Sequence, residues 1–541
     1  MSSSAELGEV FTRKWVVEMI LDLVGYRVEA DLGSTVILEP ACGTGAFLLP
    51  IVDRLLEWAQ REGQDVAGLG AAVRAFEISG ANAELARKAV TARLVDAGVL
   101  DEVARRLASS WVTIGDFLLA DIGPSDVDVV VGNPPYVRLE NVPRSLMDAY
   151  RRACPTMRGR SDLYVGFIER GLGALRPGGR LGVICADRWM RNQYGARLRE
   201  LVARSFSVET VLSMHDVDAF EDDVSAYPAV VVISRGTQGP VAVVDTTGRF
   251  SDNDAAPVVD WVRSGRAASV RGKSYKASRL TRWFDGDRLW PAGDPGQLAL
   301  LAEIESRWPT LEGPTTGTRV GIGVATGCDD VFITTNSDLV EAERLLPLRQ
   351  AVDVSSGELG WSGAYVVNPW DENGLVHLAD WPLLAEYLSA NEERLRARHV
   401  GTRRPAQWYR TIDRIDSNLL ERSRLVLPDM KSTAHPVLDD GAYYPHHNLY
   451  YVTSLHWDLE VLGGLLLSEV ANLFVGAYCV KMRGGCFRFQ AQYLRTIRVP
   501  PPEAIERRTA IDLARAFVDR DTERATVAAA VAYGIDRRRL R

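Results

Sequence analysis

The amino-terminal part of this sequence predicts a doubly wound α/β domain with a mostly parallel sheet, and a mixed α/β domain follows it. Short apolar runs typical of buried strands alternate there with amphipathic segments typical of helices. Ligands of such sheets bind outside the carboxyl ends of the strands. We expect strands at residues 35–39, 73–77, 111–116, 127–133, 180–186 and 228–234, with helices such as 47–60 and 161–175 between them.

The rest of the chain divides by composition. Residues 241–257 are rich in Gly, Asp and Thr, so we expect a linker there, after a first domain at 1–240. Beyond the linker the strand–helix alternation weakens, and prolines, tryptophans and tyrosines recur among short apolar stretches. This pattern predicts a mixed α/β domain at 258–502. After the break VPPPE, residues 503–541 predict a helical segment.

Composition indicates a cytoplasmic protein. No stretch approaches the roughly 18 consecutive apolar residues of a membrane span, and the first residues lack the pattern of a secretory signal. We expect no metal site, because no Cys-x-x-Cys pair or zinc-type spacing occurs, and because the adjacent His446 and His447 would face opposite ways on a strand. The scattered cysteines, expected to be free thiols, are Cys42, Cys154, Cys185, Cys328, Cys479 and Cys486.

Charge is distributed unevenly along the chain. Residues 401–541 contain 21 Lys+Arg against 16 Asp+Glu, a net +5, so the first 400 residues carry 42 against 55, a net −13, which together give −8. A basic end on an acidic protein is compatible with nucleic-acid contact, and equally with solvated helix surfaces.

A cofactor pocket is indicated where the first expected strand ends. It runs through Glu39 into a loop of small residues before a helix, and glycines there allow a tight turn and close approach to a ligand. The loop has no basic residue, and Glu39 would repel phosphate, which favours cationic S-adenosylmethionine over NAD or a triphosphate. The residues of this loop expected to bind the cofactor are Pro40, Ala41, Cys42, Gly43 and Gly45.

Two further carboxylates end the next two expected strands. Glu77 is suited to accept hydrogen bonds from ribose hydroxyls. Asp116 can accept from an adenine amino group, and Phe117 after it can cover the adenine ring. Either acid alone would more often be a helix cap or turn residue, but three acids at successive strand ends favour a binding site.

The strand at 127–133 leads into Asn133-Pro134-Pro135-Tyr136. Two consecutive prolines make a rigid turn with exposed carbonyls. The side-chain oxygen of Asn133 and the carbonyl of Pro134 can both accept from one NH₂ group, and Tyr136 offers a face for a planar base. We therefore predict Asn133, Pro134 and Tyr136 as catalytic residues for methyl transfer to a planar amine.

These motifs together resemble the gamma class of adenine-N6 DNA methyltransferases, the TaqI-type group of restriction–modification and related phage-defence systems. GEVFTRKWVVEMILDL resembles the family's amino-terminal segment, LEPACGTGAF its cofactor loop and NPPY its catalytic motif. SDLYVGFIERGLGALRPGGRLGVI resembles the helix–strand pair that follows, with Asp162 and Tyr164 near the cofactor or target pocket. The resemblance implies a class I S-adenosylmethionine-dependent methyltransferase fold. It also implies cofactor contacts by Thr12, Ile78 and Pro135, and stacking on the target base by Tyr136 and Phe220, with Tyr227 as the alternative to Phe220.

The resemblance further implies a function and partners. The substrate would be adenine flipped out of double-stranded DNA, and 258–502 would be a target-recognition domain. The base readers would be sought among Lys431, Arg483, Arg488 and Gln490. No nuclease pattern is evident, so a separate restriction endonuclease or defence subunit would cleave. Other hypotheses are a protein glutamine-N5 methyltransferase, which shares NPPY, an RNA adenine methyltransferase, and a catalytically inactive DNA-binding subunit.

Overall fold

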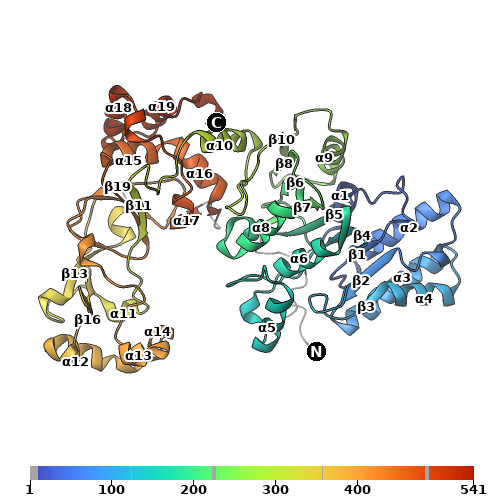
Figure 1. Ribbon diagram of the computed structural model, residues 1–541, viewed down its shortest axis with the longest axis horizontal. Helices are drawn as coiled ribbons and strands as arrows, with labels where there is room; N and C mark the ends of the chain where they lie inside the picture. Colours follow the sequence, from blue (N-terminus) through green and yellow to red (C-terminus); the bar gives the residue numbers. More distant parts are fainter. Residues whose placement is uncertain (1–9, 124, 222–226, 356, 482–485, 541) are drawn as a thin grey trace. The chain divides into compact units, whose positions relative to one another are not determined.

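The computed structural model describes residues 10–123, 125–221, 227–355, 357–481 and 486–540. The chain forms two compact units, Met1–Ala299 and Leu300–Arg541 (Figure 1).

The first unit is built on one large sheet, which has ten strands within the described residues. The strand order is β3-β2-β1-β4-β5-β7-β6-β8-β10-β9. The strands are β1 (Ile37–Glu39), β2 (Val73–Glu77), β3 (Val112–Ile114), β4 (Val127–Gly132), β5 (Leu175–Ala186), β6 (Ser207–Ser213), β7 (Pro228–Ser234), β8 (Val241–Thr246), β9 (Ser269–Arg271) and β10 (Tyr275–Leu280).

Strand direction in this sheet confirms the predicted fold class. β1 to β5 run parallel to one another, whereas β7 is antiparallel to both of its neighbours, β5 and β6. In β1 to β7, parallel strands with β7 reversed between β5 and β6 form the topology of class I methyltransferases. Because β1 to β4 run the same way, their carboxyl ends meet at one edge, where a ligand of such a sheet binds.

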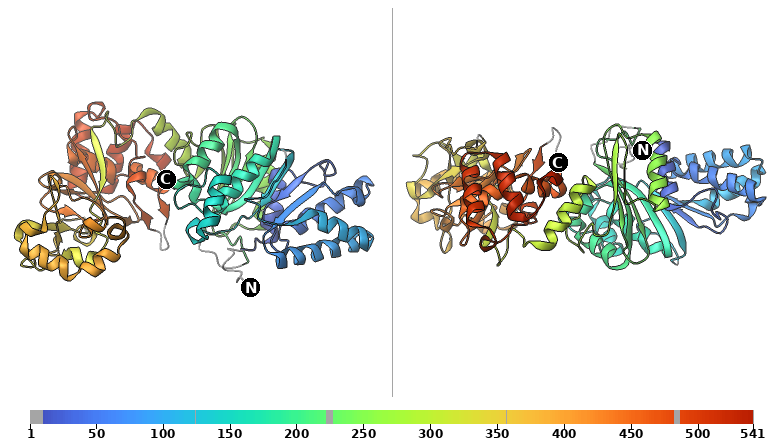
Figure 2. Two further views of the ribbon diagram at one scale, coloured as in Figure 1. Left: turned by 60° about the horizontal axis from the view of Figure 1, so that its bottom comes forward. Right: turned by 90° about the horizontal axis from the view of Figure 1, so that it is seen from above.

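Helices cover both faces of the sheet. A Cβ placed on Gly182 of β5 would lie 2.4 Å from Val24 of α1 (Lys14–Val24), whereas one on Gly171 of α6 (Tyr164–Ala174) would lie 2.9 Å from Leu181. Neighbouring residues of a strand point to opposite faces, so α1 and α6 lie on opposite sides of β5. The other α-helices of this unit are α2 (Leu48–Glu62), α3 (Gly80–Asp96), α4 (Asp101–Trp111), α5 (Arg144–Ala153), α7 (Arg188–Arg191), α8 (Ala196–Ser205) and α9 (Asp252–Ser264); α2, α3 and α4 gather beside β1–β3, in blue in Figure 2.

The expected linker at 241–257 is a wrong prediction. Residues 241–246 form β8, which pairs parallel to β6, and α9 begins at Asp252 with a capping box formed by Ser251 and Asp254. The Gly, Asp and Thr residues there supply turns and a helix cap inside the first unit. The first unit therefore extends to Ala299, and the second begins at Leu300, inside α10 (Pro295–Arg307).

The second unit contains several small sheets. β11 (Thr318–Ile322), β21 (Leu449–Ser454), β17 (Arg424–Pro428) and β19 (Val437–Asp439) form one four-stranded sheet, and β12 (Ile333–Thr334), β14 (Tyr365–Val367), β13 (Leu345–Arg349) and β20 (Tyr444–Pro445) form another. β15 (Trp370–Asp371) pairs with β16 (Gly374–Leu375), and β23 (Phe487–Arg488) lies between β18 (Met430–Lys431) and β22 (Val480–Lys481). The α-helices are α11 (Asp329–Phe332), α12 (Pro382–Ala390), α13 (Glu392–Ala397), α14 (His399–Arg403), α15 (Leu459–Leu467), α16 (Glu469–Tyr478), α17 (Ala491–Leu494), α18 (Arg507–Val518) and α19 (Thr522–Tyr533).

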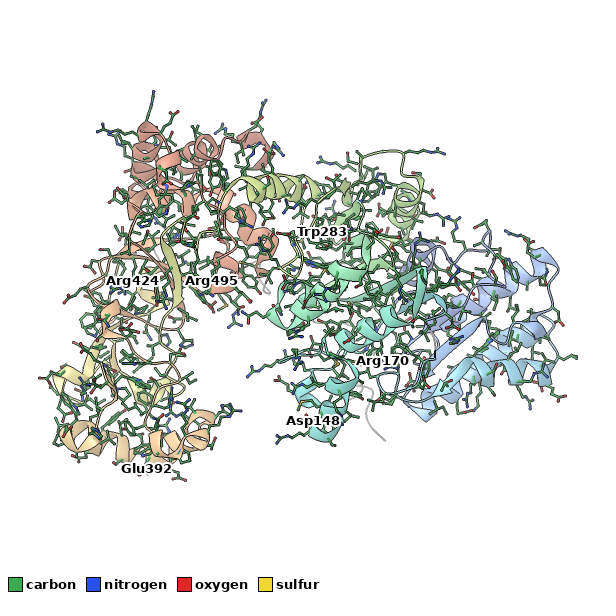
Figure 3. The ribbon with its side chains drawn as sticks, viewed as in Figure 1. Asp148, Arg170, Trp283, Glu392, Arg424 and Arg495 are labelled. Atoms are coloured by element: carbon green, nitrogen blue, oxygen red, sulfur yellow. The ribbon has the colours of Figure 1, made fainter. Side chains whose placement is uncertain are left out.

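A buried ion cluster joins the two four-stranded sheets of the second unit. The carboxylate of Asp439 accepts from Arg349 at 3.1 Å and from Arg424 at 3.2 Å, and all three side chains are almost fully buried (Arg424 is labelled in Figure 3). Two arginines share one carboxylate here. Arg424 also donates to the carbonyls of Leu419 and Tyr443, and Arg349 donates to the carbonyl of Gly360. Loss of that carboxylate would leave two buried cations unbalanced.

Among the described residues, no single helix is long and apolar enough to cross a membrane. α15 and α16 reach the required length and hydropathy only as a pair, which bends by 61° at the break between them.

Candidate functional site

A cavity of about 290 Å³ lies at the carboxyl ends of the first strands. Most of the residues predicted to bind a cofactor border it, as does Asn133, whereas Gly45, Pro134, Tyr136 and Phe220 do not. Those predicted residues that line the cavity are Thr12, Glu39, Pro40, Ala41, Cys42, Gly43, Glu77, Ile78, Asp116, Phe117 and Pro135. Strand-end positions were predictable because parallel strands bring their ends to one edge.

The loop after β1 supplies one wall of the cavity. Gly43 and Gly45 have φ angles of 53° and 112°, a backbone region that side-chain-bearing residues rarely adopt, so the loop depends on glycine at both positions. Cys42 is 3% exposed, and burial together with the charges of Glu39 and Glu77 raises the pKa of its thiol. The thiol therefore stays protonated and acts as a packing group, not as a nucleophile.

Two buried carboxyl groups face this loop, and they differ in their partners. Glu77 accepts from the backbone N–H of Gly43 at 2.9 Å and from that of Ser79 at 2.8 Å. Glu39 is 2% exposed, and its Oε2 has no hydrogen-bond partner. Burial, and then the charge of Glu77, raise the pKa of Glu39 well above its ordinary value. A buried carboxyl without a partner is suited to a cationic ligand group, which would restore its ionised form.

Asp116 and Ile78 border another part of the cavity. The Asp116 carboxylate accepts from the backbone N–H of Leu118 and from the hydroxyl of Tyr150 at 2.7 Å. Tyr150 lies on α5 and was not found by sequence reasoning, because nothing near it in the sequence indicates that α5 reaches the cavity. Ile78 is 55% exposed, so its side chain is free to cover a ligand.

Phe117 lines the cavity but is also part of an aromatic cluster. Its ring stacks on Phe167 with centroids 5.6 Å apart and meets Phe76 edge-on at 5.5 Å. Phe117 is 2% exposed, so the ring is held rigidly by these neighbours.

Asn133 is fixed by the amino-terminal segment. Its Nδ2 donates to the carbonyl of Val10 at 2.9 Å and to the hydroxyl of Thr12 at 3.2 Å, while its Oδ1 is buried and has no partner. Thr12 is held in turn by an antiparallel bridge to Phe220. The two acceptors engage the NH₂ of the amide, so the free oxygen is the atom left for a substrate donor.

The aromatic residues predicted for base stacking lie in different surroundings. The ring of Tyr136 is 6.3 Å from that of Phe220, nearly perpendicular to it, and 6.3 Å from that of Tyr164. Tyr227 instead packs edge-on against His215, with centroids 5.2 Å apart. Phe220 therefore lies beside the NPPY turn.

A hydrogen-bonded group of three polar side chains lies next to Tyr136. The hydroxyls of Tyr164 and Tyr194 are 2.7 Å apart, and Tyr194 donates to Asp162 at 3.1 Å. Burial raises the pKa of Asp162, and its hydrogen bond from Tyr194 opposes this shift. Asp162 and Tyr164 were predicted to lie near the cofactor or target pocket, whereas Tyr194 was not.

In the second unit, three of the side chains predicted to read bases form hydrogen bonds or ion pairs with other residues of that unit. Lys431 donates to the carbonyl of Ser355 at 2.9 Å, Arg488 pairs with Asp429 at 3.5 Å, and Gln490 accepts from Gln492 at 2.8 Å. Arg483 lies outside the described residues.

A groove of about 460 Å³ in the second unit is lined by exposed basic side chains. It is bordered by β11, by β21 and by the segment 413–422. Arg319 and Arg422 line it, are exposed, and form no ion pair within the described ranges. Arg495, labelled in Figure 3, also lines the groove and is paired with Glu312 at 2.9 Å.

The expectation that His446 and His447 face opposite ways is wrong. Both residues lie between β20 and β21, where the chain turns, and not inside a strand, so the alternation of side chains along a strand does not apply. Their ring centroids are 4.1 Å apart, and Asp329 lies beside them.

Comparison with known proteins places the chain in a family. The model of the Eco57I restriction-modification methylase family matches residues 108–220, which include the NPPY turn. The chain is 43% identical to the type II methyltransferase M.PaeR7I of Pseudomonas aeruginosa, over 98% of this chain and 92% of that protein. It is 42% identical to M.XhoI of Xanthomonas vasicola, over 98% of each.

The chain belongs to the type II restriction–modification methyltransferases.

Solved structures agree with this fold. The type IIL restriction-modification enzyme MmeI aligns with a TM-score of 0.58 at 12% identity, covering 97% of this methyltransferase and 74% of the MmeI chain. The type ISP enzyme LlaBIII aligns with a TM-score of 0.54 at 11% identity, covering 96% of this chain and 39% of that one.

S-adenosylmethionine is the cofactor of this methyltransferase, as it is of its class. The residues present fit it, because the cavity offers an unpartnered buried carboxyl oxygen on Glu39 for a cationic group. Its lining, among the residues that the structure describes, includes no basic side chain for a phosphate. The methyl group to be transferred comes with this cofactor.

Proposed function

We propose that this type II methyltransferase transfers a methyl group to the exocyclic N6 amino group of an adenine flipped out of duplex DNA. The proposal rests on the Oδ1 of Asn133, a buried acceptor without a partner at the edge of the cofactor cavity. An oxygen so placed needs a donor, and an aromatic amino group supplies one.

In this mechanism the chain mainly positions the amine. Asn133 Oδ1 and the carbonyl of Pro134 each accept one hydrogen of the NH₂ group, which draws its nitrogen lone pair out of conjugation with the ring and toward the methyl donor. Thr12 and Val10 keep the amide of Asn133 in the required orientation. Such positioning and fixed dipoles supply most of the rate gain.

The aromatic residues would hold the flipped base. Extruding a base costs a few kcal/mol, and stacking on an aromatic ring recovers part of that cost. Tyr136 is suited to this role by its place in the NPPY turn, and Phe220 by its contact with the Tyr136 ring. We propose Phe220 over Tyr227, because Tyr227 packs on His215.

The second unit would bind the DNA. MmeI and LlaBIII, which share the fold, were solved in complex with DNA. We propose that the groove with Arg319 and Arg422 contacts the DNA backbone, because exposed arginines that form no ion pair with any described residue can neutralise phosphates. The near-complete coverage of M.PaeR7I and M.XhoI supports a modification component that acts with a separate endonuclease.

The alternative hypotheses are less well supported. A protein glutamine-N5 methyltransferase would present the same amine to NPPY, but the relatives matched over nearly the full chain are type II methyltransferases. RNA is a further alternative substrate, and offering duplex DNA and RNA of one sequence to the purified enzyme distinguishes the two.

The test is the identity of the modified base. The chain is expressed in a host that lacks adenine methylation, and genomic DNA is digested to nucleosides and analysed by mass spectrometry. We expect N6-methyladenine with the wild type and with Asn253→Ala, an exposed control on α9. Asn133→Ala should abolish the mark while calorimetry still detects S-adenosylmethionine binding.

Two results would contradict the proposal. Methylated cytosine without methylated adenine would show that the substrate is wrong. Undiminished adenine methylation in Asn133→Ala would show that Asn133 does not hold the amine.

A further inference from the structure

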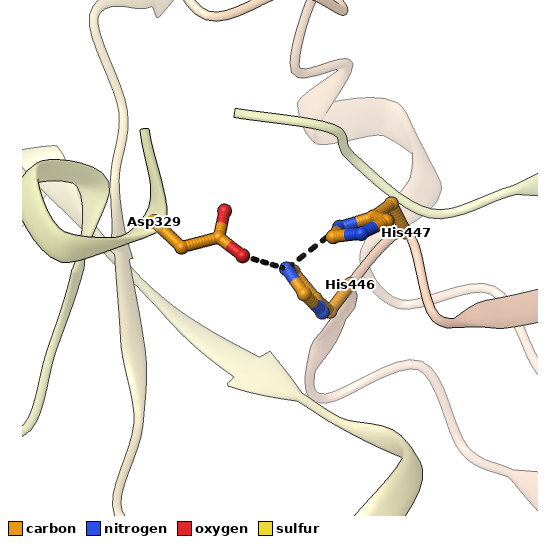
Figure 4. A group of neighbouring side chains, drawn as sticks. All are labelled: Asp329, His446 and His447. Atoms are coloured by element: carbon orange, nitrogen blue, oxygen red, sulfur yellow. Dashed lines mark hydrogen bonds and ion pairs between the residues drawn. The ribbon is translucent and has the colours of Figure 1, made fainter. Parts of the chain in front are cut away.

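Three side chains from distant parts of the sequence converge in the second unit (Figure 4). The Nδ1 of His447 is 2.9 Å from the Nε2 of His446, and that Nε2 is 3.3 Å from Oδ2 of Asp329. One potential ligand atom from each residue lies within 4.8 Å of the other two. Nothing in the methyl-transfer reaction uses these groups.

Nε2 of His446 has two close neighbours, the Asp329 oxygen and the His447 nitrogen. The direction of an N–H bond on Nε2 is fixed in the ring plane, so one proton there serves only one of these neighbours, and the other, which is exposed, is left to water. Without that proton, the lone pair of Nε2 faces the carboxylate. A cation among the three atoms removes the conflict, because neutral imidazole nitrogens and carboxylate oxygens all direct lone pairs at it.

The distances also match metal coordination. Zn²⁺ binds nitrogen and oxygen ligands at about 2.0–2.2 Å in tetrahedral geometry, which places neighbouring ligand atoms about 3.3 Å apart. Two of the three separations, 2.9 and 3.3 Å, are close to this value, and the third, between His447 and Asp329, is within 4.8 Å.

Backbone hydrogen bonds fix the main chain that carries the two imidazoles. The N–H of His446 donates to the carbonyl of Arg349 at 2.9 Å, and the N–H of His447 donates to that of Val324 at 3.0 Å. Gly323 makes this close approach possible, because a Cβ there would lie 2.2 Å from the carbonyl oxygen of His446. The site therefore rests on paired backbone, not on a loose loop.

Asp329 is oriented by a neighbour in the same way that metal-binding carboxylates often are. Its second oxygen, Oδ1, accepts from the hydroxyl of the buried Thr326. Oδ2 is thereby turned toward His446. Asp329 and His447 are exposed, so an ion can reach the group from solvent.

We propose that Asp329, His446 and His447 form a binding site for a divalent transition-metal ion, with Zn²⁺ as the best match. Two imidazoles and one carboxylate favour Zn²⁺, Co²⁺ or Ni²⁺ over Mg²⁺, which prefers oxygen ligands. Water would take the fourth position. The ion would link Asp329, at the start of α11, to the two histidines in the turn before β21. This structural role is independent of the proposed methyl transfer.

The test uses the full chain without a polyhistidine tag, kept reduced and stripped of metal with EDTA. Zn²⁺ is titrated in competition with a chromogenic chelator, and Co²⁺ binding is followed by visible absorption. We expect one equivalent of Zn²⁺ per chain, with at least tenfold weaker binding in His447→Ala and Asp329→Asn. Both changes are at exposed positions, and His399→Ala, an exposed histidine elsewhere in the unit, is the matched control.

A second measurement separates binding from damage to the fold. Zn²⁺ should raise the urea midpoint of the wild type and of His399→Ala but not that of the other two variants, because only a folded site binds the ion. Absence of Zn²⁺ uptake would overturn the proposal. So would equal affinity in all variants, or a thiolate–Co²⁺ charge-transfer band, which would assign the ion to a cysteine.

Discussion

Replacing Glu39 by Gln should weaken cofactor binding and stabilise the cofactor-free protein at the same time. Glutamine keeps the shape of the side chain and one acceptor oxygen but cannot ionise. A hydrogen bond to a charged group contributes about 1.5–3 kcal/mol. Losing the charge of Glu39 beside the cationic cofactor should therefore raise the Kd of S-adenosylmethionine by about 10- to 150-fold.

The stability gain follows from the raised pKa of Glu39. In the unfolded chain this carboxyl ionises near its ordinary value of 4.5, whereas burial keeps it protonated to higher pH in the folded protein. The wild type therefore loses stability as pH rises from about 4.5 through the folded pKa, and the variant does not. The loss grows with the difference between the two pKa values, so Glu39→Gln should be more stable than the wild type near neutral pH.

Two assays and one control test this reasoning. Calorimetry gives the Kd across pH, and wild-type affinity should rise with pH as Glu39 ionises, while the affinity of Glu39→Gln stays nearly flat. Urea unfolding of the cofactor-free protein gives the stability. Glu77→Gln is the matched control, because both of its oxygens already accept backbone hydrogen bonds, so this variant should lose stability and affinity together.

The reasoning about Glu39 is refuted by either of two results. If Glu39→Gln binds S-adenosylmethionine as tightly as the wild type, no cationic group of the cofactor meets this carboxyl. If its stability falls as in Glu77→Gln, then Glu39 has a structural partner, and its free oxygen does not mark the binding site.

Three further predictions concern other parts of the molecule. Thr12→Val removes an acceptor of Asn133 Nδ2, so kcat at saturating cofactor should fall about five- to tenfold. Thr12→Ser should restore it, and an unchanged kcat would contradict the positioning role. Asp439→Asn should lower the free energy of unfolding of the second unit by about 3–5 kcal/mol in urea, because two buried arginines lose their carboxylate; a change below about 1 kcal/mol would contradict this. Arg319→Ala should weaken DNA binding at all sequences and reduce the salt dependence of the binding constant by about one phosphate contact. The control Arg396→Ala, which removes an arginine already paired with Glu392, should change neither. An altered sequence preference in Arg319→Ala would argue for base contact instead.

Two strands of the sheet have the bounds that were predicted. β7 matches 228–234 because it is a continuous apolar run that is buried along its whole length. β2 matches 73–77, where every second residue is buried and the residues between are half-buried. β6 was missed because Glu209 interrupts its apolar pattern. Arg180 of β5 pairs with Glu209 at 2.9 Å, and such a cross-strand contact is not visible in the local sequence.

The site was predictable to the extent that it lies at strand ends. Glu39, Glu77 and Asp116 follow successive parallel strands, so topology alone brings them to one cavity. The hydrogen-bond partners of the site residues come from distant parts of the sequence. Tyr150 on α5 donates to Asp116, and Asn133 donates to the carbonyl of Val10 across 123 residues of sequence. No local pattern encodes such pairs.

Buried oxygens without partners connect the fold to the function. A folded chain pairs nearly all of its buried polar atoms, since each unpaired one costs about 1–3 kcal/mol. Among the described side chains, the buried carboxyl and amide oxygens without a partner are those of Glu39, Asn133, Asp429 and Gln492. Two of these four residues border the same cavity, from the ends of β1 and β4. The first unit is therefore less stable for lack of hydrogen bonds at two atoms, Oε2 of Glu39 and Oδ1 of Asn133. A cationic methyl donor would interact with the first, and the amine that accepts the methyl group would donate to the second. Substitutions that raise its stability should therefore concentrate there and reduce its activity.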